Sequence, residues 1–146
     1  MTDEQLVKKK LARILTCVHQ LRTLADYAKF DVDVVQQGFV ERTLQVAIEA
    51  ALDVASHIVS EERLGEPSSN HEMFVLLARA GWVDASQVDP LKRMTGFCNV
   101  LVHEYEDVDL AIVKLVATTK LGDLEAFVRA VSARVVAEAA KGPSGV

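Results

Sequence analysis

Residues 40–59 read VERTLQVAIEAALDVASHIV, and their apolar side chains recur at alternating spacings of four and three residues. The row consists of Val40, Leu44, Ala47, Ala51, Val54 and Ile58. This spacing keeps one apolar stripe on one helix face and therefore predicts a long helix. A second row, formed by Ile48, Leu52, Ala55 and Val59, makes the apolar surface wider than one packing contact requires. We expect this helix to be wedged between several others or to share its outer edge with a second subunit, and we favour a homodimer.

The same spacing continues towards the amino terminus. Apolar residues from Val7 to Ala28 predict a first helix of about three heptads. The segment 30–33 interrupts it, and either Asp31 or Asp33 can accept a hydrogen bond from the first N–H groups of the next helix. Cations occupy other faces of the first helix: Lys8, Lys9, Lys10, Arg13 and Arg22. Two interpretations are open: these cations either form a solvated surface or contact an RNA backbone.

A short third helix is predicted after the long one. The segment 65–67 contains Gly and Pro and ends the long helix. Ser69 and Glu72 have the S-x-x-E spacing in which a hydroxyl and a carboxylate cap a helix start. Gly81 can take the left-handed conformation that closes a helix end, and we expect Trp82 to pack as a lid on the core.

The carboxyl-terminal half also has helical spacing. A fourth helix begins near Asp89-Pro90, where proline is tolerated in the first turn, and ends at about His103. Residues 110–120 and 124–135 predict one or two further helices with a kink at Gly122.

Composition supports an all-helical fold. The 146 residues include seven Gly and three Pro, too few turn formers for a sandwich or barrel of short strands. Half of the residues are apolar and 25% are charged, which excludes a disordered chain. We predict an all-α, antiparallel up-and-down bundle of four to six helices, with one domain over residues 1–140 and a flexible tail over 141–146.

Charge and cysteine content exclude several classes of function. A net charge of -5 argues against a generic nucleic-acid coat, so any RNA contact must be local. The amino terminus lacks a secretory signal and no apolar run could span a membrane, which predicts a cytoplasmic protein. Cys17 and Cys98 are far apart and are expected to be free thiols. No E-x-x-H pair occurs among the four histidines, which are His19, His57, His71 and His103. We therefore expect neither a metal nor a cofactor.

One polar cluster differs from the bundle pattern: residues 94–109 read MTGFCNVLVHEYEDVD. His103 follows three apolar residues, and burial can tune its pKa for general acid or base work, although a lone histidine is more often structural. Tyr105 offers a hydroxyl but alone reads as a core tyrosine with a solvated tip. Asn99 either hydrogen-bonds within the bundle or contacts a substrate. Spacing alone therefore indicates a helical bundle and no activity.

The pattern Met94-x-x-Phe97-x-Asn99-Val-Leu-Val-His103-x-Tyr105 resembles the signature of the HepT-like family of HEPN-domain ribonuclease toxins. That signature consists of Arg, a polar residue, three more residues, His, any residue and Tyr. Residues 41–57 resemble the family's second helix, and residues 67–84 resemble its third helix and glycine stop. The resemblance covers the chain from about Val7 to Ala140.

The resemblance implies metal-free RNA cleavage, in which a 2′-hydroxyl attacks the adjacent phosphate. His103 would act as acid or base and Asn99 as an orienting polar group. This sequence has Cys98 at the position of the family's arginine, and a thiol carries no fixed positive charge. Loss of one such electrostatic contact costs ~10²–10³-fold in rate. Arg93, five residues earlier and on another side of the helix, is the nearest substitute.

The resemblance also implies partners. Family members form homodimers with two motif copies in one cleft, and they pair with a small, MntA-like nucleotidyltransferase antitoxin that transfers AMP to the motif tyrosine, here Tyr105. AMP adds bulk and negative charge, which would repel RNA. We therefore predict the toxin of a type VII-like toxin–antitoxin system, an endoribonuclease attenuated by Cys98 that forms hetero-oligomers with its antitoxin. The alternative is a non-catalytic HEPN module that binds a nucleotide or the nucleotidyltransferase.

Overall fold

The structure is a computed structural model that describes the backbone of residues 3–103 and 108–141, and their side chains except that of His103. These residues form six α-helices and one 3-10 helix and contain no strand. The helices are α1 (Glu4–Thr23), α2 (Val34–Glu61), α3 (Asn70–Arg79), η1 (Ala85–Gln87), α4 (Val88–His103), α5 (Leu110–Thr119) and α6 (Leu121–Ala140). The prediction of an all-α fold with four to six helices is confirmed.

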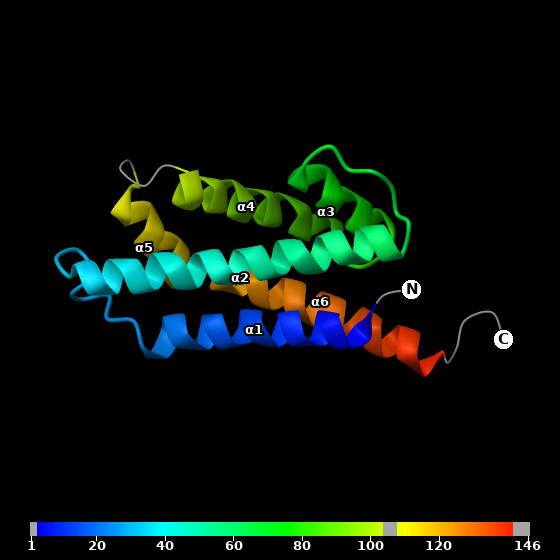
Figure 1. The fold of residues 1–146 in the computed structure, drawn as a ribbon, viewed down its shortest axis with the longest axis horizontal. Coiled ribbons are helices and arrows are strands. Elements are labelled where there is room, and N and C mark those ends of the chain that lie inside the picture. Colours follow the sequence, from blue (N-terminus) through cyan, green and yellow to red (C-terminus); the bar gives the residue numbers. More distant parts are fainter. Residues whose placement is uncertain (1–2, 104–107, 142–146) are drawn as a thin grey trace.

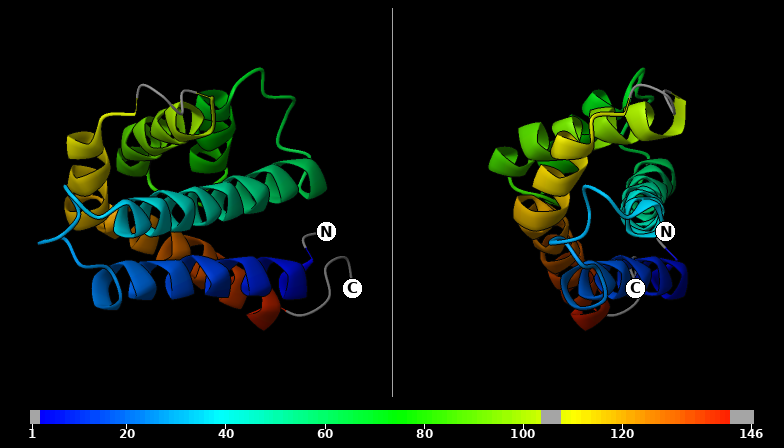
Figure 2. Two further views of the ribbon diagram at one scale, coloured as in Figure 1. Left: turned by 60° about the vertical axis from the view of Figure 1, so that its left-hand side comes forward. Right: turned by 90° about the vertical axis from the view of Figure 1, so that its left-hand side faces the viewer.

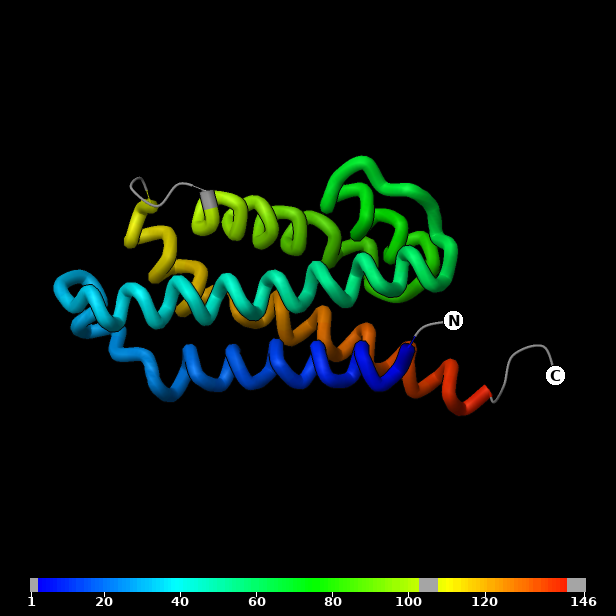
Figure 3. Tube along the Cα trace, viewed as in Figure 1, coloured from blue at the N-terminus to red at the C-terminus, as the bar shows by residue number. Residues whose placement is uncertain are grey.

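Helix α2 runs antiparallel to α1 on one side and to α4 on the other. Figure 1 shows α1 and α2 side by side in opposite directions, with α6 behind them. Helix α4 packs along the other side of α2, antiparallel to it, and α3 packs against α4. Figure 2 shows α5 at one end of the bundle, and the trace in Figure 3 follows the chain from α5 directly into α6. Helix α2 contacts α1, α3, α4, α5 and α6, so its wide apolar surface is covered within one chain. The homodimer remains a prediction.

The first helix ends earlier than the apolar spacing predicts. Helix α1 ends at Thr23, and Ala25 and Ala28 lie in the connection that follows. There the Asp26 carboxylate accepts hydrogen bonds from the backbone N–H groups of Ala28 (3.1 Å) and Lys29 (3.3 Å). An aspartate bonded in this way stabilises a turn in place of another helical turn. The predicted extension to residue 28 is therefore wrong.

Other boundaries follow the predicted capping residues. Asp33 accepts hydrogen bonds from two N–H groups in the first turn of α2. Ser69 accepts one from the N–H of Glu72 (3.1 Å), while the Glu72 carboxylate binds Ser68 instead of completing the reciprocal pair with Ser69. Gly81, after α3, has φ +82°, a left-handed conformation that favours glycine.

The break between the last two helices precedes the predicted kink at Gly122. Helix α5 ends at Thr119 and α6 begins at Leu121, so Gly122 lies within the first turn of α6. The hydroxyls of Thr118 and Thr119 donate to backbone carbonyls one turn earlier (2.7 and 2.6 Å). Such hydroxyl contacts destabilise a helix and favour its end here.

Trp82 packs on the core, as expected, and is 2% exposed. The Arg134 guanidinium lies over its ring, 4.9 Å from the centroid. Among the described residues, no helix is long and apolar enough to cross a lipid bilayer. The predicted tail, residues 141–146, lies outside the described residues except for Lys141.

Candidate functional site

The predicted polar cluster begins on α4, and its residues 104–107 lie outside the described residues. The core-facing residues of α4 are Val88, Leu91, Met94, Thr95, Cys98 and Leu101. Arg93 and Asn99 are exposed. His103 is the last residue of α4, one turn after Asn99; its side chain and the whole of Tyr105 lie outside the described residues. Of the predicted site residues, the structure therefore describes the side chains of Asn99, Cys98 and Arg93 only.

Asn99 has an exposed side chain on the last turns of α4. Within the described part of the chain, no hydrogen bond ties its amide to the bundle, whereas the Thr95 hydroxyl, also on α4, donates to the Lys92 carbonyl (2.9 Å). An exposed amide can donate to and accept from a ligand. The exposed amide is therefore accessible to a ligand, and the substrate contact remains a prediction.

Cys98, the residue before Asn99, points into the core and is 4% exposed. Burial, and then the negative charge of Glu49 on α2, raise the pKa of its thiol to about 11. Glu49 is itself held by Gln45, whose side-chain amide donates to the carboxylate at 2.9 Å. Near neutral pH the thiol is therefore uncharged, and position 98 supplies no cation to the site.

Arg93 points away from position 98. Five residues in an α-helix turn through 500°, so Arg93 and Cys98 point about 140° apart. Arg93 lines a cavity of about 210 Å³ between α4 and α5, together with Phe97 and Ile112. The structure thus places Arg93 on the α5 side of α4, away from Glu49 and Cys98.

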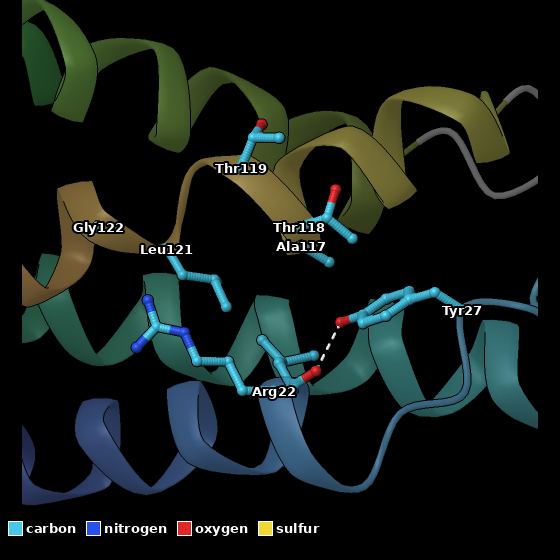
Figure 4. A pocket seen from close by; sticks show the side chains of 8 residues that line it. Arg22, Tyr27, Ala117, Thr118, Thr119, Leu121 and Gly122 are labelled. Atoms are coloured by element: carbon cyan, nitrogen blue, oxygen red, sulfur yellow. Dashed lines mark hydrogen bonds between the residues drawn. The ribbon is translucent and has the colours of Figure 1, made fainter.

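A second cavity, of about 230 Å³, lies where the end of α1 meets the junction of α5 and α6 (Figure 4). The polar groups that line it form hydrogen bonds with other groups of the protein. The Tyr27 hydroxyl donates to the Leu21 carbonyl at 2.7 Å, and the Arg22 guanidinium binds both carboxylate oxygens of Glu125 at 2.8 and 2.6 Å. The threonine hydroxyls at the end of α5 bind backbone carbonyls. We therefore assign this cavity a structural role.

A third cavity was not anticipated from the sequence. A groove of about 440 Å³ between α1 and α2 is lined by Lys9, Arg13 and Arg42, all three exposed. The spacing of Lys9 and Arg13 places them on one face of α1, a signal available in the sequence. Arg42 belongs to another helix, and its proximity to them depends on the packing of α2 on α1.

No metal centre is evident in the part of the chain that the structure describes: it contains no group of three or more His, Cys, Asp or Glu side chains able to hold an ion. His57 instead accepts a hydrogen bond at Nε2 from the backbone N–H of Asp3 (3.1 Å), and His19 is exposed on α1. Both histidines are helix-face residues, as expected.

The sequence is similar to those of known ribonucleases. The family model described as "Ribonuclease HepT-like" matches residues 14–131, which include α4. The chain is 33% identical over 129 residues to the mRNA nuclease HepT of Shewanella oneidensis, covering 88% of this chain and 97% of that protein. It is 30% identical over 101 residues to the tRNA nuclease HepT of Aphanizomenon flos-aquae, covering 69% of each.

A solved structure is similar in fold as well as in sequence. It contains the tri-AMPylated HEPN toxin of Shewanella oneidensis in complex with MNT antitoxin. The match has a TM-score of 0.81 and 34% identity, and it covers 91% of this chain and 99% of the other. The similarity therefore extends over nearly the whole of both chains.

Proposed function

We propose a function that follows from one established fact: this chain belongs to the HepT-like ribonuclease family. The chain is the toxin of a type VII-like toxin–antitoxin system and a metal-independent endoribonuclease whose rate is lowered by Cys98. The observation that carries the proposal is the 33% identity to an mRNA nuclease over 88% of this chain and 97% of that relative. The described fold and the exposed Asn99 on α4 are consistent with it.

The proposed chemistry uses the RNA's own nucleophile. A ribose 2′-hydroxyl attacks the adjacent phosphorus; the O2′–P bond forms, the P–O5′ bond breaks, and a 2′,3′-cyclic phosphate and a 5′-hydroxyl result. His103 takes the proton from the 2′-hydroxyl or gives one to the leaving 5′-oxygen. Asn99 orients the phosphate through its amide.

Cys98 limits the rate because it leaves the phosphoryl oxygens without a cation from this position. One missing electrostatic contact of this kind costs ~10²–10³-fold. The buried, uncharged thiol also favours a second candidate, a non-catalytic HEPN module that binds a nucleotide or the nucleotidyltransferase. The two candidates differ in whether the natural chain cuts RNA at all.

RNA degradation in EDTA separates these candidates. We expect slow cleavage by the natural chain, none by His103→Ala, and faster cleavage by Cys98→Arg. If only Cys98→Arg cuts, the chain is the non-catalytic module. If all three proteins cut equally, the site lies elsewhere and the proposal is wrong.

The proposed partner is a nucleotidyltransferase antitoxin that transfers AMP from ATP to the Tyr105 hydroxyl. The AMPylated toxin and MNT antitoxin in the similar solved structure support this assignment. The bound AMP adds a phosphodiester charge near His103, which repels RNA phosphates. We further propose that the protein, one domain over residues 1–140, acts in the cytoplasm as a homodimer that assembles with the antitoxin into a hetero-oligomer.

Intact-mass measurement after co-expression with the antitoxin tests the modification. The chain has two tyrosines, which makes a matched control available. Tyr27 donates its hydroxyl to the Leu21 carbonyl and is half-buried, so Tyr27→Phe should keep the added mass. Tyr105→Phe should lose it. Retention of the added mass by Tyr105→Phe would place the modification on another residue.

A further inference from the structure

The α1/α2 groove gathers unneutralised positive charge on a chain whose net charge is -5. It measures about 440 Å³, and its polar lining consists of Lys9, Arg13, Thr16 and Gln20 from α1 with Arg42 and Thr43 from α2. The α1 residues are spaced by four, three and four, so they share one helix face. The residues that line the groove include no aspartate or glutamate.

Some other cations of the bundle are paired with carboxylates. Lys8 lies 3.9 Å from Glu4, Lys10 lies 3.1 Å from Asp53, and Arg22 binds Glu125. Among the described residues, no such ion pair involves Lys9, Arg13 or Arg42. Like charges that share a groove repel one another, and an anionic ligand would remove that repulsion.

The floor of the groove indicates which groups remain available to a ligand. Cys17 is buried there. Burial raises the pKa of its thiol, and the positive charge of Arg13 offsets part of that rise. The Arg13 guanidinium therefore lies close to the floor. Thr43 already donates its hydroxyl to the Phe39 carbonyl at 2.6 Å. The groups left for a ligand are therefore the cations, the Thr16 hydroxyl and the Gln20 amide.

The register of α2 against α4 relates this groove to the candidate site. Glu49 acts on Cys98, so the two residues lie at one level of the antiparallel pair. Arg42 precedes Glu49 by two turns, about 10 Å. It therefore lies level with the carboxyl end of α4, where His103 occurs, on a helix that separates this end from the groove.

We propose that the α1/α2 groove binds the phosphodiester backbone of single-stranded RNA, as a second contact beside the cleavage site. The inference rests on the proposed function, because it takes RNA as the substrate. Guanidinium groups bind phosphate in bidentate fashion. A protein interface would need an apolar centre, whereas the apolar lining of the groove that is not fully buried is limited to Ala12 and the half-buried Val46. RNA crossing α2 near Arg42 would reach both the groove and the end of α4.

Binding of a fluorescent, 2′-O-methylated single-stranded oligoribonucleotide tests the groove without cleavage, because the probe lacks the nucleophile. If Lys9, Arg13 and Arg42 each contact one phosphate, the logarithm of the association constant should fall with the logarithm of the salt concentration with a slope of about -2. The double variant Arg13→Ala/Arg42→Ala should flatten that slope by about 1.4 and weaken binding at low salt. The matched control Lys8→Ala/Arg129→Ala removes two exposed cations outside the groove and should bind as the natural chain does.

The outcomes separate this inference from the proposed function. Circular dichroism and thermal unfolding first establish that both double variants fold. If the groove variant keeps the natural affinity and slope, or loses affinity for the antitoxin instead of RNA, the inference is wrong. If the natural chain binds the probe through the groove but does not cut unmodified RNA in EDTA, the inference stands and the proposed function fails. If it cuts RNA and the groove variant has an unchanged KM, only the inference fails.

Discussion

The Glu49 carboxylate on α2 acts across the α2–α4 contact on the Cys98 thiol, and together with burial it raises the pKa of that thiol to about 11. The family signature has arginine at position 98, and an arginine there would meet a carboxylate at this point. This chain instead places a neutral thiol beside an anion. The neutral thiol leaves the site without a cation from this position.

Replacement of Glu49 by glutamine should lower the pKa of Cys98 below about 11 without returning it to the ordinary 9.0, because burial is the larger cause. The pH dependence of alkylation by iodoacetamide measures the change, since the thiolate is the reactive species. Cys17, on the α1 side of α2, is an internal control and should react as before. An unaltered alkylation profile for Cys98 would show that Glu49 does not act on it.

An arginine at position 98 should raise the rate of RNA cleavage by ~10²–10³-fold, because it restores a cation near the developing phosphoryl charge. Its long side chain can extend from the buried position towards the exposed Glu49. Adding Glu49→Gln to Cys98→Arg should remove part of the gain by leaving the guanidinium unpaired. The control Cys98→Met keeps position 98 neutral; cleavage by it as fast as by Cys98→Arg would contradict the electrostatic explanation.

Alanine at Gly81 should destabilise the fold by about 1 kcal/mol or more. The residue has φ +82°, and an added Cβ would lie 3.1 Å from the Arg134 side chain, which donates to the Ala80 carbonyl at 2.7 Å. Urea denaturation measures the loss. Gly38 lies within α2 with open space around its Cβ position, so Gly38→Ala should instead stabilise by about 0.5–1 kcal/mol. Equal effects at both positions would refute the role assigned to the left-handed turn.

The Arg22–Glu125 pair should make stability depend on pH. Its hydrogen bonds lower the pKa of Glu125 below 4.5, so its contribution is present above about pH 4.5 and is lost as the pH falls through the folded value. Arg22 is half exposed, which limits the contribution to under ~1 kcal/mol. Thermal unfolding of Glu125→Gln should therefore show a deficit near neutral pH that disappears in acid. Glu66→Gln, an exposed loop change of the same charge, should show no such pattern.

Much of the fold follows from local sequence. The apolar spacing predicts α2, and Asp33, Ser69 and Gly81 mark helix ends that the structure places where expected. The ends that differ, after Thr23 and before Leu121, depend on side chain to backbone hydrogen bonds of Asp26, Thr118 and Thr119. Such bonds compete with helical hydrogen bonding without altering the apolar spacing, so periodicity does not reveal them.

The amino-acid sequence by itself determined the helices, the all-α class and the candidate residues Asn99, His103 and Tyr105, because periodicity, capping and short motifs act over a few residues. Only tertiary structure decided that Cys98 is buried beside Glu49, that Arg93 faces α5, and that Arg42 joins the cations of α1. These relationships join residues far apart along the chain. Their proximity arises from how α1, α4 and α5 pack around α2, which no local pattern specifies.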